Sequence, residues 1–584
     1  MRLFAELQRR NVLRAGVLYI GAVWALAQGI AQLAPAFGAP EWVTMWFVIA
    51  AAIGFPFWLA FSWVYEWTPQ GLKRESEIAA DASITRSTGR RMDRAIIVVL
   101  AVAVVLLLTN TFVWKRGAGL QGEAATAARP TAPAIDPDSI AVLPFVDMSQ
   151  AQDQEYFSDG LSEELLDLLA KVPQLKVIAR TSSFSFKGKN LDIAQIARQL
   201  GVATILEGSV RKSGNTLRIS AQLIRASDAT HLWSDTYDRE LTDVFKVQDE
   251  IAGAVVEALK LKLLPEQAPV GTGRTDNMQA HNHFLLASEW MTKGTIESYR
   301  AAAGEYQRAI DLDSGYVSAL VGLANANGYI ADLTGDAATA DQALSVVEQA
   351  LALDPGNAEA LAARAWLRTE FKWDFNGARA DYEAALQADP NAASVLRRYG
   401  WFLAAVGQLP EGLQMARRAL DRDPLGIDGL WTLGLILSGS GKSAEACDML
   451  LAAGAATRGE YTSMVLAESL VQAGRSAEVA SATQHSEPRV RLLGAALAQH
   501  SLGNDDASRR ALDELTQKYA AGMAYQIAQV HAWRGEADAA FAWLDKALTL
   551  HDGGMMLITY DPFLASLRAD PRYAALVRRM GFSG

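Results

Sequence analysis

The sequence contains one cysteine, Cys447, and this excludes a disulfide bond within the chain. Whatever folds here must be held together by hydrophobic packing. Cys447 directly follows Ala446, a position of the helical repeat described below, so we expect its thiol to pack inside a helix pair rather than to react.

Metal-binding and catalytic patterns are also lacking. His281 and His283 stand two residues apart, which places them on different faces of a helix, and no Cys, Asp or Glu clusters with them. The glycines at 208 and 214 do not have the spacing of a phosphate-binding loop. No Ser, His and Asp set stands out either. The sequence therefore predicts no catalytic residue, no metal site and no cofactor.

An excess of positive charge is absent from most of the chain. Residues 1–116 hold 12 Lys and Arg against 7 Asp and Glu, whereas the whole chain has a net charge of −11, so the remainder stands at −16. An acidic protein repels the phosphate backbone, and we therefore expect no nucleic-acid partner.

Long apolar runs, in contrast, crowd into the N-terminal part. Those from Ala15 to Pro40, Trp42 to Tyr65 and Ala95 to Trp114 each reach the roughly 20 residues that cross a bilayer. They predict three transmembrane helices at about 15–38, 42–66 and 95–114, and so a lipid bilayer as a partner. The first run is too long for a cleaved signal peptide.

Lys and Arg gather before the first apolar run and after the second, and none lies between these two. By the positive-inside rule, this distribution predicts an inner-membrane protein with a cytoplasmic N-terminus. Three crossings would place the residues after about 115 in the periplasm. Residues 117–138 are rich in Ala, Gly and Pro, which predicts a flexible linker.

Residues 139–264 alternate between strand and helix signals and predict a small α/β domain of order βαβαβββα. A hairpin is expected around Ser213-Gly214-Asn215, where alternating segments meet a turn. Ser158 and Asp159 offer side-chain acceptors, so we expect them to cap the first helix. Residues 265–280 read as a second linker.

From residue 281 to 584 the chain is helical with a repeating pattern. Ala343, Val347 and Ala350 recur in steps of 34 or 35 residues as Ala378, Tyr382 and Ala385, as Gly412, Ala416 and Ala419, and as Ala446, Leu450 and Ala453. Asp-Pro pairs at 354, 389 and 423 follow at a constant offset, where proline ends a helix. We estimate seven or eight repeats and a C-terminal cap.

These segments resemble known families. FSDGLSEELLDLL (157–169), VIARTSSFSFKGK (177–189), LGVATILEGSVRKSGNTLRISAQLI (200–224) and HLWSDTYDRELTDVFKVQDEI (231–251) are similar to the TolB-like, FlgO-like domain of bacterial membrane-anchored proteins. The repeats resemble tetratricopeptide repeats, and the N-terminus resembles the membrane module of one branch. The adenylate cyclase domain or winged-helix domain that other relatives carry is missing.

The predicted fold class is therefore multidomain: three transmembrane helices, the α/β domain and an all-α solenoid. Stacked helix pairs form a concave groove that binds peptides. In the repeat register Trp366, Arg397, Trp401 and Trp431 could face this groove and anchor a protein or peptide. The alternative is that these tryptophans fill gaps between repeats.

The favoured hypothesis is a membrane-anchored periplasmic scaffold without catalysis, which binds a protein or peptide in the repeat groove. An envelope sensor, in which the TolB-like domain binds a ligand, is the second hypothesis. An enzyme of the adenylate cyclase type is the third. The oligomeric state is open, and a homo-oligomer is possible.

Overall fold

The computed structural model divides into two compact units, Met1–Ala132 and Pro133–Gly584. The described residues of the first unit are 19, 23, 49–51, 54–58, 65–68 and 71–74. Those of the second are 135–149, 155–172, 174–189, 191–213, 216–240, 244–259, 275, 277–454 and 459–582.

The first unit corrects the membrane prediction. Its described part holds short helical stretches at 49–51 and 54–58 and an antiparallel hairpin of β1 (Tyr65–Thr68) and β2 (Gly71–Arg74). A bilayer crossing needs about 20 continuous apolar helical residues. Among the described residues, no helix combines that length with that hydropathy.

The prediction of three transmembrane helices is therefore wrong by this measure. Most of 15–38 and 42–66, and all of 95–114, lie outside the described residues. The end of the second predicted span is extended, because Tyr65 pairs with Arg74 across the hairpin. The bilayer partner, the inner-membrane location, the cytoplasmic N-terminus and the periplasmic placement all depended on these helices, and they are withdrawn with them.

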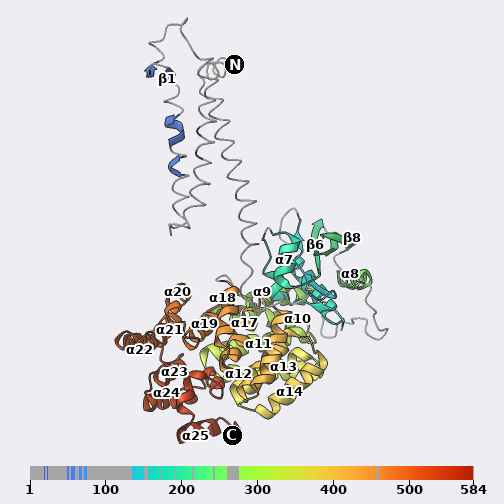
Figure 1. The fold of residues 1–584 in the computed structure, drawn as a ribbon. Helices are drawn as coiled ribbons and strands as arrows, with labels where there is room; N and C mark the ends of the chain where they lie inside the picture. The colour runs from blue at the N-terminus through green and yellow to red at the C-terminus, as the bar shows by residue number, and fades with distance from the viewer. Residues whose placement is uncertain are drawn as a thin grey trace. The chain divides into compact units, whose positions relative to one another are not determined.

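The small α/β domain is present, and it contains a mixed sheet in the order β5-β3-β6-β7-β8, with β4 beside β6 (Figure 1). Its strands are β3 (Ser139–Val142), β4 (Val146–Asp147), β5 (Lys176–Val177), β6 (Thr204–Ser213), β7 (Thr216–Arg225) and β8 (Thr230–Glu240). Its helices are α5 (Glu155–Ala170), α6 (Arg180–Phe184), α7 (Ile193–Leu200) and α8 (Val244–Ala258). Strand β3 runs parallel to β5 and β6, whereas β6, β7 and β8 are antiparallel.

Of two local predictions in this domain, one is confirmed and one is wrong. The predicted hairpin is confirmed, since Ser213 pairs with Thr216 at the end of β6 and β7. The predicted helix cap is wrong, because α5 already begins at Glu155 and Asp159 lies inside it. There the Asp159 carboxylate accepts a hydrogen bond from Lys187 Nζ at 2.5 Å instead of from the helix N-terminus.

The repeat region consists of eight antiparallel helix pairs in the described residues (Figure 1). They are α9 (Met278–Met291) with α10 (Ile296–Leu312), α11 (Val317–Thr334) with α12 (Ala337–Leu353), α13 (Ala358–Leu367) and η5 (Arg368–Lys372) with α14 (Phe375–Ala388), α15 (Ala393–Ala405) with α16 (Leu409–Arg422), α17 (Ile427–Gly439) with α18 (Ser443–Ala452), α19 (Glu460–Gln472) with η7 (Ser476–Glu478) and α20 (Val479–Ala482), α21 (Pro488–Ser501) with α22 (Asp505–Tyr519), and α23 (Ala524–Trp533) with α24 (Ala537–Thr549).

The repeating signature residues form the core of this array. Ala343, Val347 and Ala350 are fully buried, and the equivalent residues of the other pairs are buried as well, except Ala453, which is partly buried. Small residues let the paired helices come close: a methyl group on Gly400 would lie 3.0 Å from the carbonyl oxygen of Gly412. Buried small residues in this period are what tetratricopeptide repeats require.

Two further expectations concern single elements. Cys447 is fully buried, as predicted, and burial raises the pKa of its thiol to about 11. The C-terminal segment contains η8 (Gly553–Leu557), η9 (Pro562–Leu567) and α25 (Pro571–Arg579). It packs on the last pair, where Trp533 meets Phe563 edge to face at 5.2 Å.

The α/β domain contacts the array at two distant places. Leu285 of α9 packs against Gly160 of α5, and the Asp423 carboxylate, after α16, accepts hydrogen bonds from Ser182. The backbone N–H of Ala179 also donates to the carbonyl oxygen of Arg422 at 2.8 Å. The domain thereby joins the first helix pair to the end of the fourth.

Candidate functional site

The predicted groove residues all lie on the first helices of their pairs. Trp366 is on α13, Arg397 and Trp401 are on α15, and Trp431 is on α17. First helices line the concave side of a stacked array, and we call this side the inner face.

Trp366 belongs to the packing between repeats. It is 8% exposed, and its ring lies 5.0 Å from that of Tyr329 on the preceding pair. A methyl group on Gly328 would collide with it, and the guanidinium of Arg398 stands 5.1 Å from its ring centre. For this tryptophan the geometry favours the alternative that it fills a gap.

Arg397, Trp401 and Trp431 are brought together. The two tryptophan rings meet edge to face at 6.4 Å. Asp428 links the cluster, because its carboxylate lies 3.7 Å from Arg397 Nη2 and accepts a hydrogen bond from Trp431 Nε1 at 3.2 Å.

Tyr461 on α19 extends this cluster and was missed in the sequence. Its ring lies 5.9 Å from that of Trp431, and it is 48% exposed. Trp401, Trp431 and Tyr461, called the aromatic ledge below, are spaced by 30 residues, about one helical turn less than the repeat. That spacing is the signal that could have identified Tyr461.

Carboxyl groups on the inner face make up a second feature that sequence reasoning missed. Asp332, near the end of α11, is exposed, yet the pKa of its carboxyl is raised to about 6. The main cause is desolvation of the carboxyl group by the surrounding protein, and the negative charge of Asp552 raises the pKa further.

Glu370 in η5 lies next to Asp332. It is 8% exposed, its Oε1 atom has no hydrogen-bond partner among the described residues, and burial followed by the charge of Asp332 raises its pKa well above the usual value. Both carboxyl groups approach the C-terminal segment: a methyl group on Gly553 would lie 3.6 Å from Asp332 Oδ1 and from Glu370 Oε2.

Two tyrosines show that distant repeats face one another here. Burial raises the pKa of Tyr299 on α10, and the nearby Tyr329, Asp428 and Asp332 raise it further. Burial likewise raises the pKa of Tyr461, with Asp332 next in importance. Side chains from α10, α11, α17 and α19 are thus close enough for their charges to interact across the inner face.

The C-terminal segment closes part of this face. Thr559 Oγ1 donates a hydrogen bond to the carbonyl oxygen of Ala405 at 2.8 Å, and the His551 ring stacks on Trp373 at 4.7 Å. Seven of its apolar side chains are at most 3% exposed: Met555, Met556, Ile558, Tyr560, Phe563, Leu564 and Leu567. The segment is therefore part of the core and not a detachable strap.

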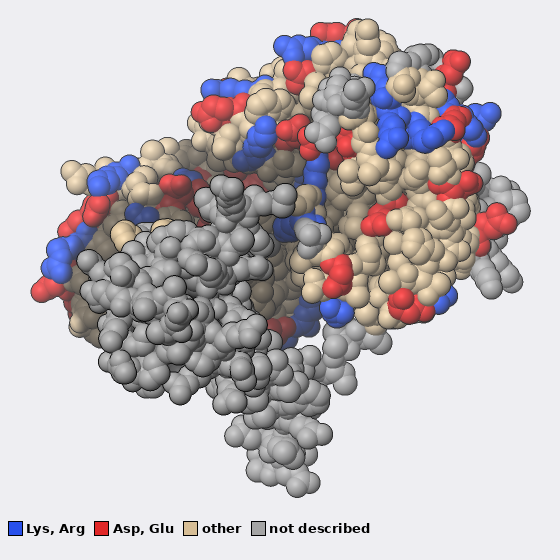
Figure 2. All heavy atoms as spheres, turned by 90° about the horizontal axis from the view of Figure 1, so that it is seen from above, with Lys and Arg blue, Asp and Glu red and all other residues tan. Residues whose placement is uncertain are grey.

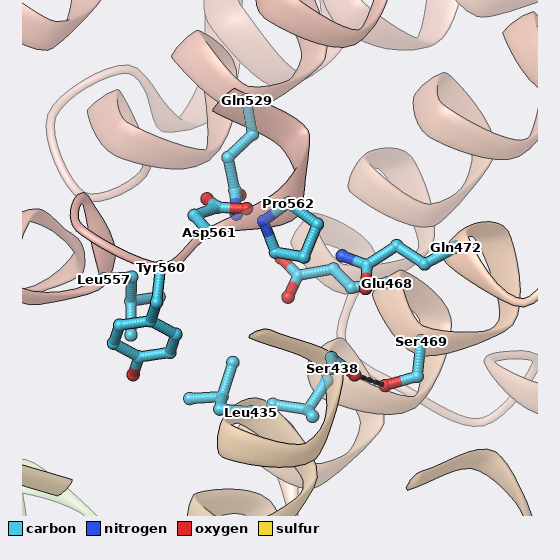
Figure 3. Close-up of a pocket in the computed structure, with 11 residues that line it drawn as sticks. Leu435, Ser438, Glu468, Ser469, Gln472, Gln529, Leu557, Tyr560, Asp561 and Pro562 are labelled. Atoms are coloured by element: carbon cyan, nitrogen blue, oxygen red, sulfur yellow. Dashed lines mark hydrogen bonds between the residues drawn. The ribbon is translucent and has the colours of Figure 1, made fainter. Parts of the chain in front are cut away.

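Beneath this segment is a cavity of about 10 Å³, enough for one water molecule (Figure 3). Glu468 of α19 lines it, and burial together with the charge of Asp561 raises its pKa to about 8. Asp561 accepts hydrogen bonds from Tyr525 Oη and Gln529 Nε2, each at 2.8 Å. The cavity is too small for a ligand and is a structural feature.

Charges of both signs intermingle on the surface shown in Figure 2, with no broad face of one sign. In the described part of the chain, no group of three or more His, Cys, Asp or Glu side chains could hold a metal ion. The aromatic ledge and the neighbouring carboxyl groups are therefore the most distinctive chemical arrangement on the described array.

Comparison with known proteins gives matches to parts of the chain. Residues 136–254 match the second domain of HilA/YgeH-like transcriptional regulators, which differs from the TolB-like family that the motifs indicate. A putative adenylate cyclase 3 of Rhizobium meliloti (strain 1021) is 41% identical over 183 residues. This match covers 31% of the chain and 31% of the relative, so the chain spans about a third of that relative's length.

Solved structures with helical repeats are also similar in part. PilF of Pseudomonas aeruginosa shares 21% identity over 35% of this chain and 93% of its own, with a TM-score of 0.28. Human IFIT1, in a dimer with PPP-AAAA, shares 14% identity over 52% of this chain and 78% of its own, with a TM-score of 0.34. The repeat architecture of this chain follows from its own helix pairs and their buried signature residues.

Proposed function

We propose that this chain is a protein-interaction scaffold that binds a segment of a partner protein on the inner face of its repeat array. The observation that carries the proposal is the aromatic ledge. Its three rings come from consecutive first helices, each ring packs against the next, and all are partly exposed beside the Arg397–Asp428 pair. Rigid aromatic rings next to a charged pair are typical anchors of protein interfaces.

The test is crosslinking in cells that produce the full chain. A photoreactive amino acid replaces Trp431, and, as a matched control, a second variant carries it at Leu353, which is 54% exposed on the second helix of its pair. We expect position 431 to yield a defined protein adduct that position 353 does not. The same adducts from both positions, or no adduct from 431, would contradict the proposal.

The scaffold proposal includes the absence of catalysis, and because the Rhizobium meliloti relative is named a putative adenylate cyclase, cyclase activity should be measured. Purified full chain is incubated with ATP and a divalent cation, and cyclic AMP is measured over time. We expect none above a heat-treated sample. Its formation would replace the scaffold proposal with an enzymatic one.

A further inference from the structure

The carboxylate of Asp332 pairs with no cation among the described residues. Asp428 faces Arg397, and Asp552 accepts hydrogen bonds from the backbone N–H groups of Tyr525 and Gly554. Asp332, in contrast, makes no hydrogen bond or ion pair with another described residue, although it is exposed on the inner face. A carboxylate in such a position strongly favours an approaching cation.

Glu370 supplies an independent indication. Its side chain is more than nine-tenths buried, and its Oε1 atom has no hydrogen-bond partner in the described part of the chain. Its other oxygen lies near Gly553, as Asp332 Oδ1 does. A buried carboxyl without a full set of partners costs free energy unless something compensates for it. Positive charge placed at Asp332 would reduce this cost.

We propose that the partner segment enters the inner face with a lysine or arginine side chain, whose cationic group lies against the Asp332 carboxylate, beside Glu370. This inference rests on the proposed function and specifies the chemistry of the partner. Asp332 Oδ1 and Glu370 Oε2 would each lie 3.6 Å from a methyl group on Gly553, so the two carboxyl groups are close enough to act on one ligand.

Charge decides against an anionic partner at this place. Glu370 of η5 and Asp552 of the C-terminal segment both lie near Asp332 of α11, and Arg397 already faces Asp428. A phosphate or a carboxylate of the partner would meet this group of acids. Like charges at such distances repel.

The experiment uses purified full chain and two fluorescent heptapeptides. One is polyalanine with two central lysines, and the other carries norleucine at the same positions, which keeps the apolar stem but removes the charge. Fluorescence anisotropy measures binding to wild type, to Asp332→Asn and to Asp506→Asn. Asp506 is an exposed acid of α22 and controls for the loss of one negative charge.

We expect wild type and Asp506→Asn to bind the lysine peptide about tenfold or more tightly than the norleucine peptide, and Asp332→Asn to lose that preference. Thermal unfolding checks that the variants are folded. Equal binding of both peptides by wild type, or equal losses in the two variants, would overturn the inference.

The pH dependence gives a second measurement. Burial raises the pKa of Asp332 to about 6, and Asp552 and Glu370 lie near it, so binding of the lysine peptide should strengthen between pH 5 and pH 7.5. The two proposals can fail separately. A lost adduct at position 431 counts against the scaffold, whereas a retained adduct without lysine preference counts only against the cationic anchor.

Discussion

The α/β domain and the repeat array bury different chemistry. The main core of the α/β domain is built mostly of large aliphatic residues such as Leu165, Leu168 and Ile219, each with 0% exposure. The array is packed with alanine along its repeat positions, and it buries the carboxyl groups Glu370, Asp381, Glu468 and Asp561. In the described α/β domain the buried carboxyl is Glu164, 4.0 Å from His281 of the array.

This difference shows in which region buried polar groups lower the stability of the fold. Asp381 is matched by Arg364 and Arg368, so its burial is offset by ion pairs. Glu370 and Glu468 have raised pKa values, and no cation of the described chain pairs with them, so their ionised forms lower stability. Unmatched groups of this kind concentrate at functional or strained sites, and here both belong to the array.

The largest effect is expected in the aliphatic core of the α/β domain. Leu168→Ala removes a fully buried side chain in α5 and should lower the free energy of unfolding by about 2–5 kcal/mol. Urea denaturation followed by circular dichroism measures it. Leu353→Ala is the control, because a half-exposed side chain should change stability by less than about 1 kcal/mol. Similar losses in both variants would contradict the assigned core.

The next effect concerns the buried acid Glu468. Its pKa is raised from 4.5 to about 8 in the folded chain, so between these values the folded state keeps a proton that the unfolded state has lost. Stability must therefore fall as the pH rises from about 4.5 to 8. Glu468→Gln removes this dependence on pH. We therefore expect the free energy of unfolding of the variant, relative to that of wild type, to rise by about 1–3 kcal/mol between pH 5 and pH 8.5.

Denaturation curves at pH 5, 7 and 8.5 give this difference, and Glu411→Gln on the exposed surface of α16 provides the control. If the free energies of unfolding of Glu468→Gln and wild type differ by the same amount at every pH, Glu468 does not hold a proton in the folded state between pH 5 and pH 8.

A smaller effect tests how the two regions are joined. Asp423→Ala removes the acceptor of two hydrogen bonds from Ser182 and should cost about 1–3 kcal/mol. Hydrogen exchange should accelerate at residues 179–184 more than in the sheet. Asp421→Ala breaks the bond to Lys176 Nζ, but its carboxylate is 60% exposed and the effect should be under about 1 kcal/mol. Unchanged exchange in Asp423→Ala would refute this contact.

The smallest effect lies on the sheet surface. Arg218 and Asp238 form a two-bond ion pair between β7 and β8, and both side chains are more than half exposed. Solvent screening leaves such a pair with little effect on stability. Arg218→Ala should therefore shift the unfolding midpoint only slightly, and less in high salt. A larger loss would mean that the sheet relies on its surface charges.

Much of the second unit could be predicted because its signals are local. The 34-residue period identified the helix pairs, since small residues must recur wherever paired helices touch, and the alternating segments identified the hairpin of β6 and β7. The helix cap at Asp159 failed because a cap pattern also fits residues inside a helix, where Lys187, distant in sequence, takes the carboxylate. The membrane prediction rested on hydropathy, on the distribution of Lys and Arg and on a family resemblance, and it was wrong.

For the candidate site, sequence and structure each supplied a part. The repeat register by itself determined that Arg397, Trp401 and Trp431 lie on first helices, because that follows from helical periodicity. Only the tertiary structure decided that Trp366 is buried between repeats, that Tyr461 joins the ledge, and that Asp332 meets the C-terminal segment. The curvature of the array brings these residues together, and it arises from the sum of all contacts between neighbouring pairs, which no local pattern encodes.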